Sequence, residues 1–211
     1  MVDPNSRTWQ ALGLAADVVV VNALTIVCSL PVVTAGAALS AAHGTLLEMV
    51  REEGAKPART YFSYFTRTWR TATFGWLLLL AVGSVLGWEY WALGRMDGGA
   101  ALVAQAGVLA GAILVTLWAV WFFPLASRGE GFARTAKLAA LLALGKLPRS
   151  LLASVWLVIP AVLIILNPGG WVLWLAVMAI IGVALMLYLV DLVVVETIDS
   201  LPPRGSTVSA Q

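Results

Sequence analysis

The feature that most constrains this chain is the apolar run at residues 171–190, WVLWLAVMAIIGVALMLYLV, which contains no formal charge. The hydrocarbon core of a bilayer is about 30 Å thick and an α-helix rises about 1.5 Å per residue, so roughly 20 apolar residues span it. The whole chain agrees with this reading, because 61% of its 211 residues are hydrophobic and only 11% are charged. A soluble domain carries about 25% charged residues. We therefore expect an integral membrane protein built from helices.

Six segments are candidate membrane spans. They cover residues 10–30, 32–50, 72–93, 101–126, 150–166 and 171–195. Short turns join them in pairs, which predicts an all-α transmembrane bundle of six spans, arranged as three hairpins in one domain over residues 1–198. Segment 32–50 is rich in Ala and Gly and is only marginally hydrophobic, so a re-entrant or interfacial helix there, leaving five spans, is the alternative. Residues 199–211 are predicted to form a disordered tail.

The two longer connections, 51–71 and 127–149, are basic, and each contains a predicted amphipathic helix, at 60–72 and at 132–147. In the six-span arrangement every Lys and Arg except Arg95 lies on one side of the membrane, which the positive-inside rule makes cytoplasmic. Aromatic and basic side chains on such helices suit lipid headgroups or a docking partner equally. The candidate surface consists of Phe62, Phe65, Arg67, Trp69, Arg70, Arg134 and Lys137.

Small residues recur at four-residue spacing in three of the segments, a pattern that lets neighbouring helix backbones approach closely in lipid. In segment 32–50 this stripe predicts a helix sheltered by its neighbours. In the third and fourth spans the glycine pairs sit at similar depth, which predicts a tight antiparallel hairpin. The predicted packing residues are Gly36, Ser40, Gly44, Gly83, Gly87, Gly107 and Gly111.

Polar residues inside the predicted spans are functional candidates, because lipid does not solvate them. Asp17 and Asn22 lie in the first span and His43 in the second. Folding the hairpin at Pro31 places Asp17 and His43 at nearly equal depth, which predicts a carboxylate–imidazole pair. The pair is either a proton-linked or substrate-gripping site, or a buried contact that fixes the register of the hairpin. Asp191 and Glu196 are expected to pair with linker arginines such as Arg149, or to reach the interface.

The residues also exclude several kinds of chemistry. A single histidine and a single cysteine leave no multi-residue metal site of the usual kinds, and no phosphate-binding loop or nucleophile elbow occurs. We therefore expect no enzyme activity, no metal and no cofactor. Anionic lipid headgroups explain the basic linkers more simply than nucleic acid does, so membrane lipids are the expected partners.

Four stretches, in order, resemble the YesL-like family of bacterial membrane proteins. They are Asn22 with CSLPVVTAGAALSAA at 28–42, YFSYFTRTWRTA at 61–72, FFPLASR at 122–128, and the segment 140–151 with KLPRSL. The resemblance covers residues 10–170, and Leu-Pro-x-x-Thr-x-Gly at 30–36 is its most specific part. It implies a small multi-pass plasma-membrane protein of about five spans, frequently associated with carbohydrate uptake by ATP-driven (ABC) transporters. The family brings no established catalytic residues.

Two functions from different classes follow. The first is a non-enzymatic accessory or interaction subunit, associated with a carbohydrate ABC transporter or with further copies of itself, which docks through the two amphipathic helices. The second is a small stand-alone transporter or channel that uses Asp17, Asn22 and His43 along a polar path. The basic loops and the C-terminus are expected in the cytoplasm, and the side of the N-terminus stays open.

Overall fold

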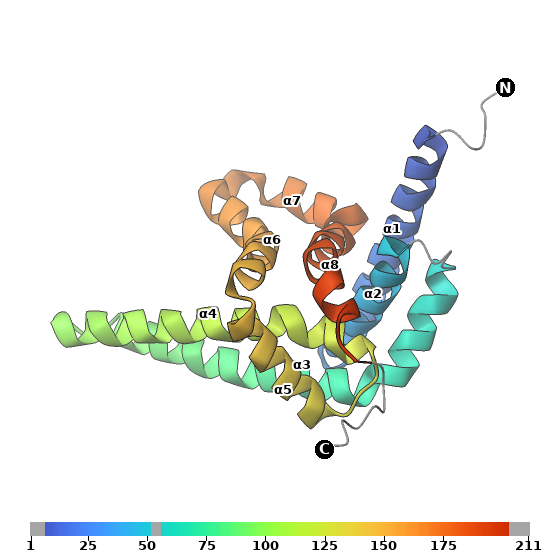
Figure 1. Ribbon diagram of the computed structural model, residues 1–211. Helices are drawn as coiled ribbons and strands as arrows, with labels where there is room; N and C mark the ends of the chain where they lie inside the picture. The colour runs from blue at the N-terminus through green and yellow to red at the C-terminus, as the bar shows by residue number, and fades with distance from the viewer. Residues whose placement is uncertain (1–6, 52–55, 203–211) are drawn as a thin grey trace, which may run out of the picture.

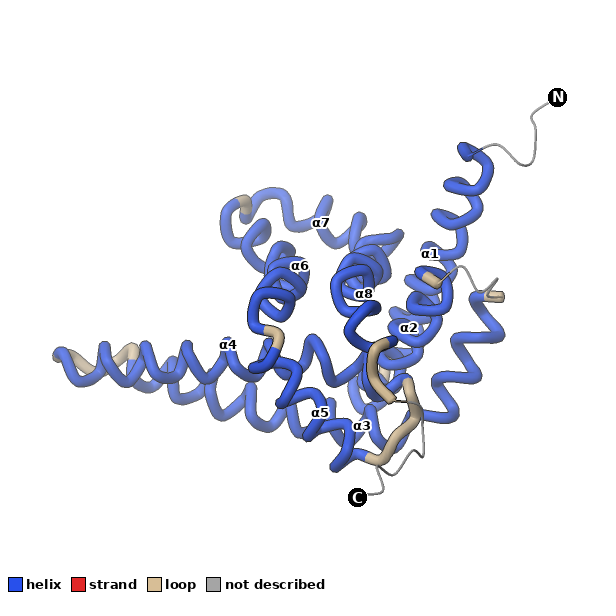
Figure 2. The backbone as a smooth tube through the Cα atoms, in the orientation of Figure 1, coloured by secondary structure: helices blue, strands red, loops and turns tan. Residues whose placement is uncertain are grey.

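The computed structural model describes residues 7–51 and 56–202, which fold into helices joined by short loops (Figures 1 and 2). Within these residues no strand occurs, as the predicted all-α class requires. The helices are α1 (Arg7–Ser29), α2 (Ala35–Val50), α3 (Pro57–Leu93), α4 (Gly99–Ser127), α5 (Phe132–Gly145), α6 (Leu147–Leu166), α7 (Trp171–Val177) and α8 (Val183–Asp199). The predicted disordered tail, 199–211, is wrong at its start, because Asp199 is the last residue of α8 and the carbonyl of Pro202 accepts a hydrogen bond from Arg128. The remaining residues of the tail, 203–211, lie outside the described residues.

Four helical segments of the described chain are long and apolar enough to cross a bilayer, or five if one bent pair is counted as a span. The four segments are Ala11–Ser29, Pro57–Leu93, Gly99–Ser127 and Trp171–Asp199. The bent pair joins Phe132–Gly145 to Leu147–Pro160 at 104°. The predicted count of six spans is not confirmed. Segment 32–50 is in neither count, because its helix α2 has 16 residues and is therefore about 24 Å long, shorter than the hydrocarbon core. Segment 150–166 enters only the count of five, as part of the second helix of the bent pair.

Helix α2 is the centre of the molecule. It packs against α1, α3, α4 and α8, and most of its side chains are buried (Figure 1). Because these side chains are mainly Ala, Gly and Ser, four neighbours can surround one helix at short range. A marginally hydrophobic sequence is sufficient here, since protein rather than lipid covers the helix.

Two glycines of α2 are required for the contact with α3. A Cβ atom on Gly36 would collide with the backbone carbonyl of Ala72 and the Cβ of Trp76. A Cβ on Gly44 would lie 2.6 Å from the ring of Tyr64. Ser40, between them, is fully buried. The stripe of small residues on α2 therefore forms the face on which α3 lies.

The other predicted glycine contacts are wrong. Helices α3 and α4 do form a long antiparallel pair, which projects to the left in Figure 1. However, a Cβ on Gly83, Gly87 or Gly107 would meet no atom within 4 Å, and one on Gly111 would touch only the side chain of Leu86 at 3.5 Å. The backbones of α3 and α4 therefore do not pack closely at these four glycines, because larger side chains such as Leu86 lie between the helices.

The predicted amphipathic helix at 60–72 is not a separate element. It is the first third of α3, which continues without a break to Leu93. Its buried side runs through Tyr61, Thr68 and Ala72, which lie against the body of the protein. The three predicted aromatic surface residues therefore differ, because Phe65 stacks on the buried Tyr61 whereas Phe62 and Trp69 are about half exposed, at 49% and 50%.

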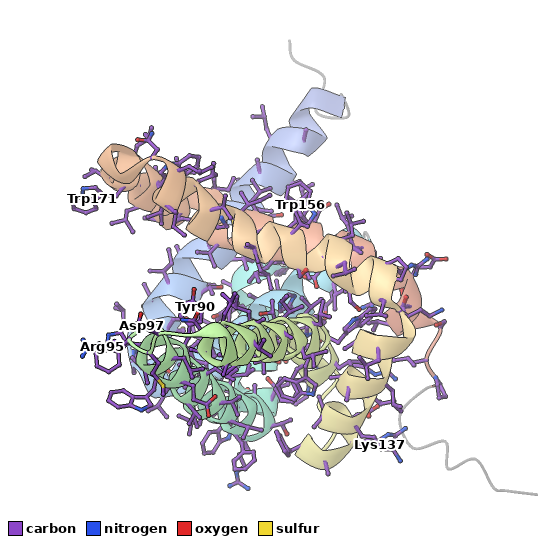
Figure 3. All side chains as sticks on the ribbon, turned by 90° about the vertical axis from the view of Figure 1, so that its left-hand side faces the viewer. Tyr90, Arg95, Asp97, Lys137, Trp156 and Trp171 are labelled. Carbon is purple, nitrogen blue, oxygen red and sulfur yellow. The ribbon has the colours of Figure 1, made fainter. Side chains whose placement is uncertain are left out.

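The second predicted amphipathic helix corresponds to α5, a separate helix that ends at Gly145. Its buried residues are Thr135, Ala139 and Ala143. Lys137 points outward from α5 in Figure 3, far from Arg95 and Asp97 at the tip of the α3–α4 pair. Leu141 and Leu144 are also exposed, so the outer face of α5 is mixed rather than purely basic.

The contact between α2 and α3 gives a matched pair of substitutions. We predict that Gly36→Ala lowers the free energy of unfolding by about 1–3 kcal/mol, because the added methyl overpacks the contact. Gly83→Ala, at an open position, should leave stability unchanged or raise it by up to about 1 kcal/mol, since Ala is the better helix former. Denaturant unfolding in detergent micelles, followed by tryptophan fluorescence, measures both. Equal responses would show that α2 does not approach α3 as described.

Candidate functional site

The most deeply buried ionisable contact joins α2 to α8. Nδ1 of His43 donates a hydrogen bond to Oδ1 of Asp191 at 2.7 Å, across 148 positions of sequence. The two side chains are 5% and 0% exposed. Oδ2 of Asp191 has no hydrogen-bond partner among the described residues. Each helix brings one polar group into an apolar interior, and the two groups can lie there because they face each other.

The predicted pairing of Asp17 with His43 is therefore wrong. The buried side of α1 runs through Val18, Val21 and Asn22, and Asp17 lies beside it, half-buried. Equal depth in a hairpin does not mean that two side chains face each other, since rotation about the helix axis decides that. The expectation for Asp191 is also wrong, since its ion-pair partner is His43. The expected pairing of Glu196 with Arg149 is confirmed.

Asn22 on α1 holds the irregular turn between α7 and α8. Residues Met178–Gly182 form a π-helical turn, in which the backbone hydrogen bonds of a regular α-helix are shifted. The Asn22 amide nitrogen donates to the carbonyl oxygens of Met178 at 3.2 Å and Ala179 at 2.8 Å. Its Oδ1 accepts a hydrogen bond from the backbone N–H of Ala184 at 2.9 Å. One buried side chain thus satisfies backbone groups on both sides of the turn.

The three predicted intramembrane residues do not form one site. Within residues 7–51 and 56–202, no hydrogen bond or ion pair joins any two of Asp17, Asn22 and His43. Nor do the described residues include a group of three His, Cys, Asp or Glu side chains placed to hold a metal ion. Asn22 and His43 instead act separately, each fastening one helix to the last membrane segment.

A second polar region lies where α2, α4 and α8 end. Arg67 donates to the backbone carbonyl of Ser127 at 2.9 Å, and its guanidinium lies 4.5 Å from the centre of the Tyr64 ring. Arg128 donates to the carbonyls of Ile198 at 3.0 Å and Pro202 at 2.8 Å. The last carbonyls of a helix have no partners within it, and cations suit that end of the helix dipole. The arginines therefore bind the helix ends to one another.

Arg149 extends this arrangement to α6. It donates to Oγ1 of Thr197 at 2.7 Å and to a carboxylate oxygen of Glu196 at 2.6 Å. Arg51 forms an ion pair with Asp199. Four arginines therefore lie at the end of the bundle where α8 ends. Two belong to α3 and α6, and the other two directly follow α2 and α4.

The predicted docking residues divide into two groups. Phe62, Trp69, Arg70 and Lys137 are exposed, and the guanidinium of Arg70 lies 5.4 Å from the centre of the Trp69 ring. The other three have partners within the protein. Phe65 stacks on Tyr61, Arg67 binds Ser127, and Arg134 pairs with Glu130 at 3.0 Å.

The sequence did not identify several residues of these contacts. Asp191 was visible as an ionisable group in an apolar run, but no spacing pattern relates it to His43. Tyr64 was assigned to no role, yet its hydroxyl donates to Oε1 of Glu48 at 2.7 Å and its ring covers Gly44. Arg128 is the last residue of the family-like stretch at 122–128, but no pattern in the sequence related it to the end of α8.

The comparison with protein families matches residues 18–90 to a family described as "Protein of unknown function, DUF624". These residues, about a third of the chain, are similar to the DUF624 family. This family includes the YesL-like bacterial membrane proteins, so the resemblance found in the sequence is confirmed. The match contains Asn22, His43 and the glycines of α2, together with most of α3. No curated protein and no solved structure matches the chain.

The contact between His43 and Asp191 predicts a large effect on stability. Asp191→Leu should lower the free energy of unfolding by about 3 kcal/mol, because it leaves the imidazole buried without a partner. In a double-mutant cycle with His43→Phe, the double variant should lose less than the sum of the two single losses. The measurement is denaturant unfolding in detergent micelles.

Asp17→Leu is the matched control. It removes a carboxylate that was predicted to lie at the same depth as His43 but that has no partner within the described residues. We expect a change of less than about 0.5 kcal/mol. A loss for Asp17→Leu as large as that for Asp191→Leu would contradict the assignment, as would strict additivity in the cycle.

Proposed function

We propose that this integral membrane protein is a non-enzymatic accessory subunit associated with carbohydrate ABC transport. Two observations support the proposal. The match to DUF624 brings the resemblance to YesL-like proteins, which implies that context. In addition, Asn22 and His43 inside the bundle are engaged in contacts between helices, which leaves the exposed surface as the place where a partner would bind.

The observation that carries the proposal is the exposed aromatic and basic face at the start of α3. Phe62 and Trp69 are about half exposed, and Arg70 lies over the Trp69 ring. Large aromatic side chains and arginine dominate the energetics of protein interfaces. On this account the face formed by Phe62, Trp69 and Arg70, with Lys137 on α5 as a further exposed cation, docks the transporter's membrane subunit.

The alternative, a stand-alone transporter or channel built on Asp17, Asn22 and His43, has less support. His43 is engaged with Asp191, and Asn22 with the turn at 178–184. Both side chains are buried against other helices. A substrate path needs groups that water or substrate can reach, whereas these groups stabilise the contacts of α1 and α2 with the last segment.

We further propose that the protein lies in the bacterial plasma membrane with the arginine-rich end of the bundle in the cytoplasm. Arg51, Arg67, Arg128 and Arg149 gather at the end where α8 finishes. Arg95 lies at the tip of the α3–α4 pair (Figure 3). The positive-inside rule places the arginine-rich end and the C-terminus on the cytoplasmic side.

The docking face is tested by co-purification from the native host in a mild detergent. We predict that a carbohydrate ABC transporter subunit is recovered with the tagged wild-type chain. Its recovery should fall about tenfold or more with the double variant Phe62→Ser and Trp69→Ser, because loss of two exposed aromatic anchors removes interface energy. Quantitative mass spectrometry of the purified complex provides the measurement.

The matched control is Trp88→Ser with Trp91→Ser, which removes two exposed aromatic side chains near the tip of the α3–α4 pair. Recovery with this control should equal that of the wild type. The proposal fails if no transporter subunit accompanies the wild-type chain. The docking face is wrong if both double variants retain the partner equally.

A further inference from the structure

A small polar cavity lies at the arginine-rich end of the bundle. Its volume is about 210 Å³, and it opens where α2, α4 and α8 end beside the first turns of α3. Three arginines line it, each from a different part of the chain: Arg51 after α2, Arg67 in α3 and Arg128 after α4. Gly44, Tyr64 and Ser127 also line it; the Tyr64 hydroxyl donates to Glu48 and the Ser127 hydroxyl to the Pro124 carbonyl. Among the described residues that line the cavity, none is acidic.

The charges around the cavity are only partly balanced. Arg51 pairs with Asp199, and Nε of Arg128 lies 3.5 Å from Oε1 of Glu130. Within the described part of the chain, Arg67 has no carboxylate at ion-pair distance; its contacts are the Ser127 carbonyl and the Tyr64 ring. The buried Nε–H of Arg128 has no hydrogen-bond partner there either. Positive charge and unused donors therefore remain at the cavity wall.

These features fit a phosphate group. The planar guanidinium has five N–H donors in a fork that matches the oxygens of phosphate, and hydrogen bonds between two charged groups are among the strongest in proteins. The cavity is smaller than the 300–1,000 Å³ typical of drug-sized ligands, so it suits a single compact anionic group. It also lies at the ends of two candidate spans, the depth at which lipid headgroups meet the protein.

We propose that the cavity formed by Arg51, Arg67 and Arg128 is a binding site for a phosphate group. The phosphate comes either from an anionic phospholipid headgroup at the inner leaflet or from a small soluble phosphate ester. Arg67 is the main recognition residue, because no carboxylate among the described residues lies at ion-pair distance from it. The site does not depend on the proposed accessory role, because it uses Arg67 and not Phe62, Trp69 or Arg70.

The test uses the purified full-length chain in detergent and native mass spectrometry. One arm adds one of three lipids: phosphatidylglycerol, phosphatidylcholine or diacylglycerol. Diacylglycerol carries no phosphate and is the negative control. The other arm adds inorganic phosphate or glycerol 3-phosphate. We expect the wild type to retain phosphatidylglycerol or one of the soluble phosphates, and to bind diacylglycerol no better than background. Retention in the first arm alone identifies a lipid site, and retention in the second a soluble ligand.

Arg67→Gln should weaken this binding about tenfold or more, because it removes a charged donor from the site. The matched control is Arg59→Gln, which removes the same charge from an exposed position two turns earlier on α3. It should change binding less than about twofold. Equal weakening by both variants would show only general attraction of anions to a basic surface and would overturn the site, as would failure of the wild type to bind any phosphate probe.

A second measurement needs no variant and so remains decisive if Arg67→Gln does not fold. Phenylglyoxal modifies accessible arginines, and peptide mass spectrometry locates the modified residues. Saturating the wild type with the phosphate probe should protect Arg67 and leave Arg59 as reactive as before. Unchanged modification of Arg67 would mean that the three arginines serve only to bind the helix ends together.

Discussion

The structure depends on how α2 is covered. Helices in lipid gain nothing from hiding apolar side chains from one another, so their association relies on close backbone approach and on polar contacts. Helix α2 uses both. Gly36 and Gly44 let α3 lie directly on its surface, and His43 fixes α8 through Asp191. The remaining helices are arranged around this centre, so a segment too short to cross the bilayer organises the segments that do.

The sequence was sufficient to predict elements whose signal is local. The uncharged run at 171–190 predicted a membrane helix. The π-turn at Met178–Gly182 within it is explained only by the tertiary contact with Asn22. Contacts were harder to predict. The small residues of α2 and the glycine pairs of α3 and α4 show the same four-residue spacing, yet only the α2 glycines pack closely on a neighbouring helix, Gly36 on the backbone of Ala72 and Gly44 on the ring of Tyr64. Spacing describes one helix face, whereas packing depends on which side chains the partner helix presents.

The residues of the candidate sites could likewise be predicted one by one, but not the partners they contact. Asp17 and His43 matched in depth, but the rotation of α1 and α2 about their axes directed His43 toward a residue 148 positions away. The arginine-lined cavity gathers residues from α2, α3 and α4 with the end of α8. In the sequence Arg67 belonged to the predicted docking surface, and Arg51 and Arg128 were positive-inside residues with no predicted contact. Their cytoplasmic placement could be predicted from charge. Their convergence on one cavity required the tertiary contacts.

The central claim, that protein rather than lipid surrounds α2, is tested most directly by photolabelling the unmodified chain in a bilayer with a lipid-soluble diazirine. Labelled positions are then located by peptide mass spectrometry. Label should appear on the lipid-facing sides of the α3–α4 pair and of α6, for example at Val85, Leu114 and Val155, which are about half exposed. Residues 35–47 should remain unlabelled until the protein is unfolded. Labelling of Ala41 or Leu46 in the folded protein, at a level comparable with Leu114, would contradict the account.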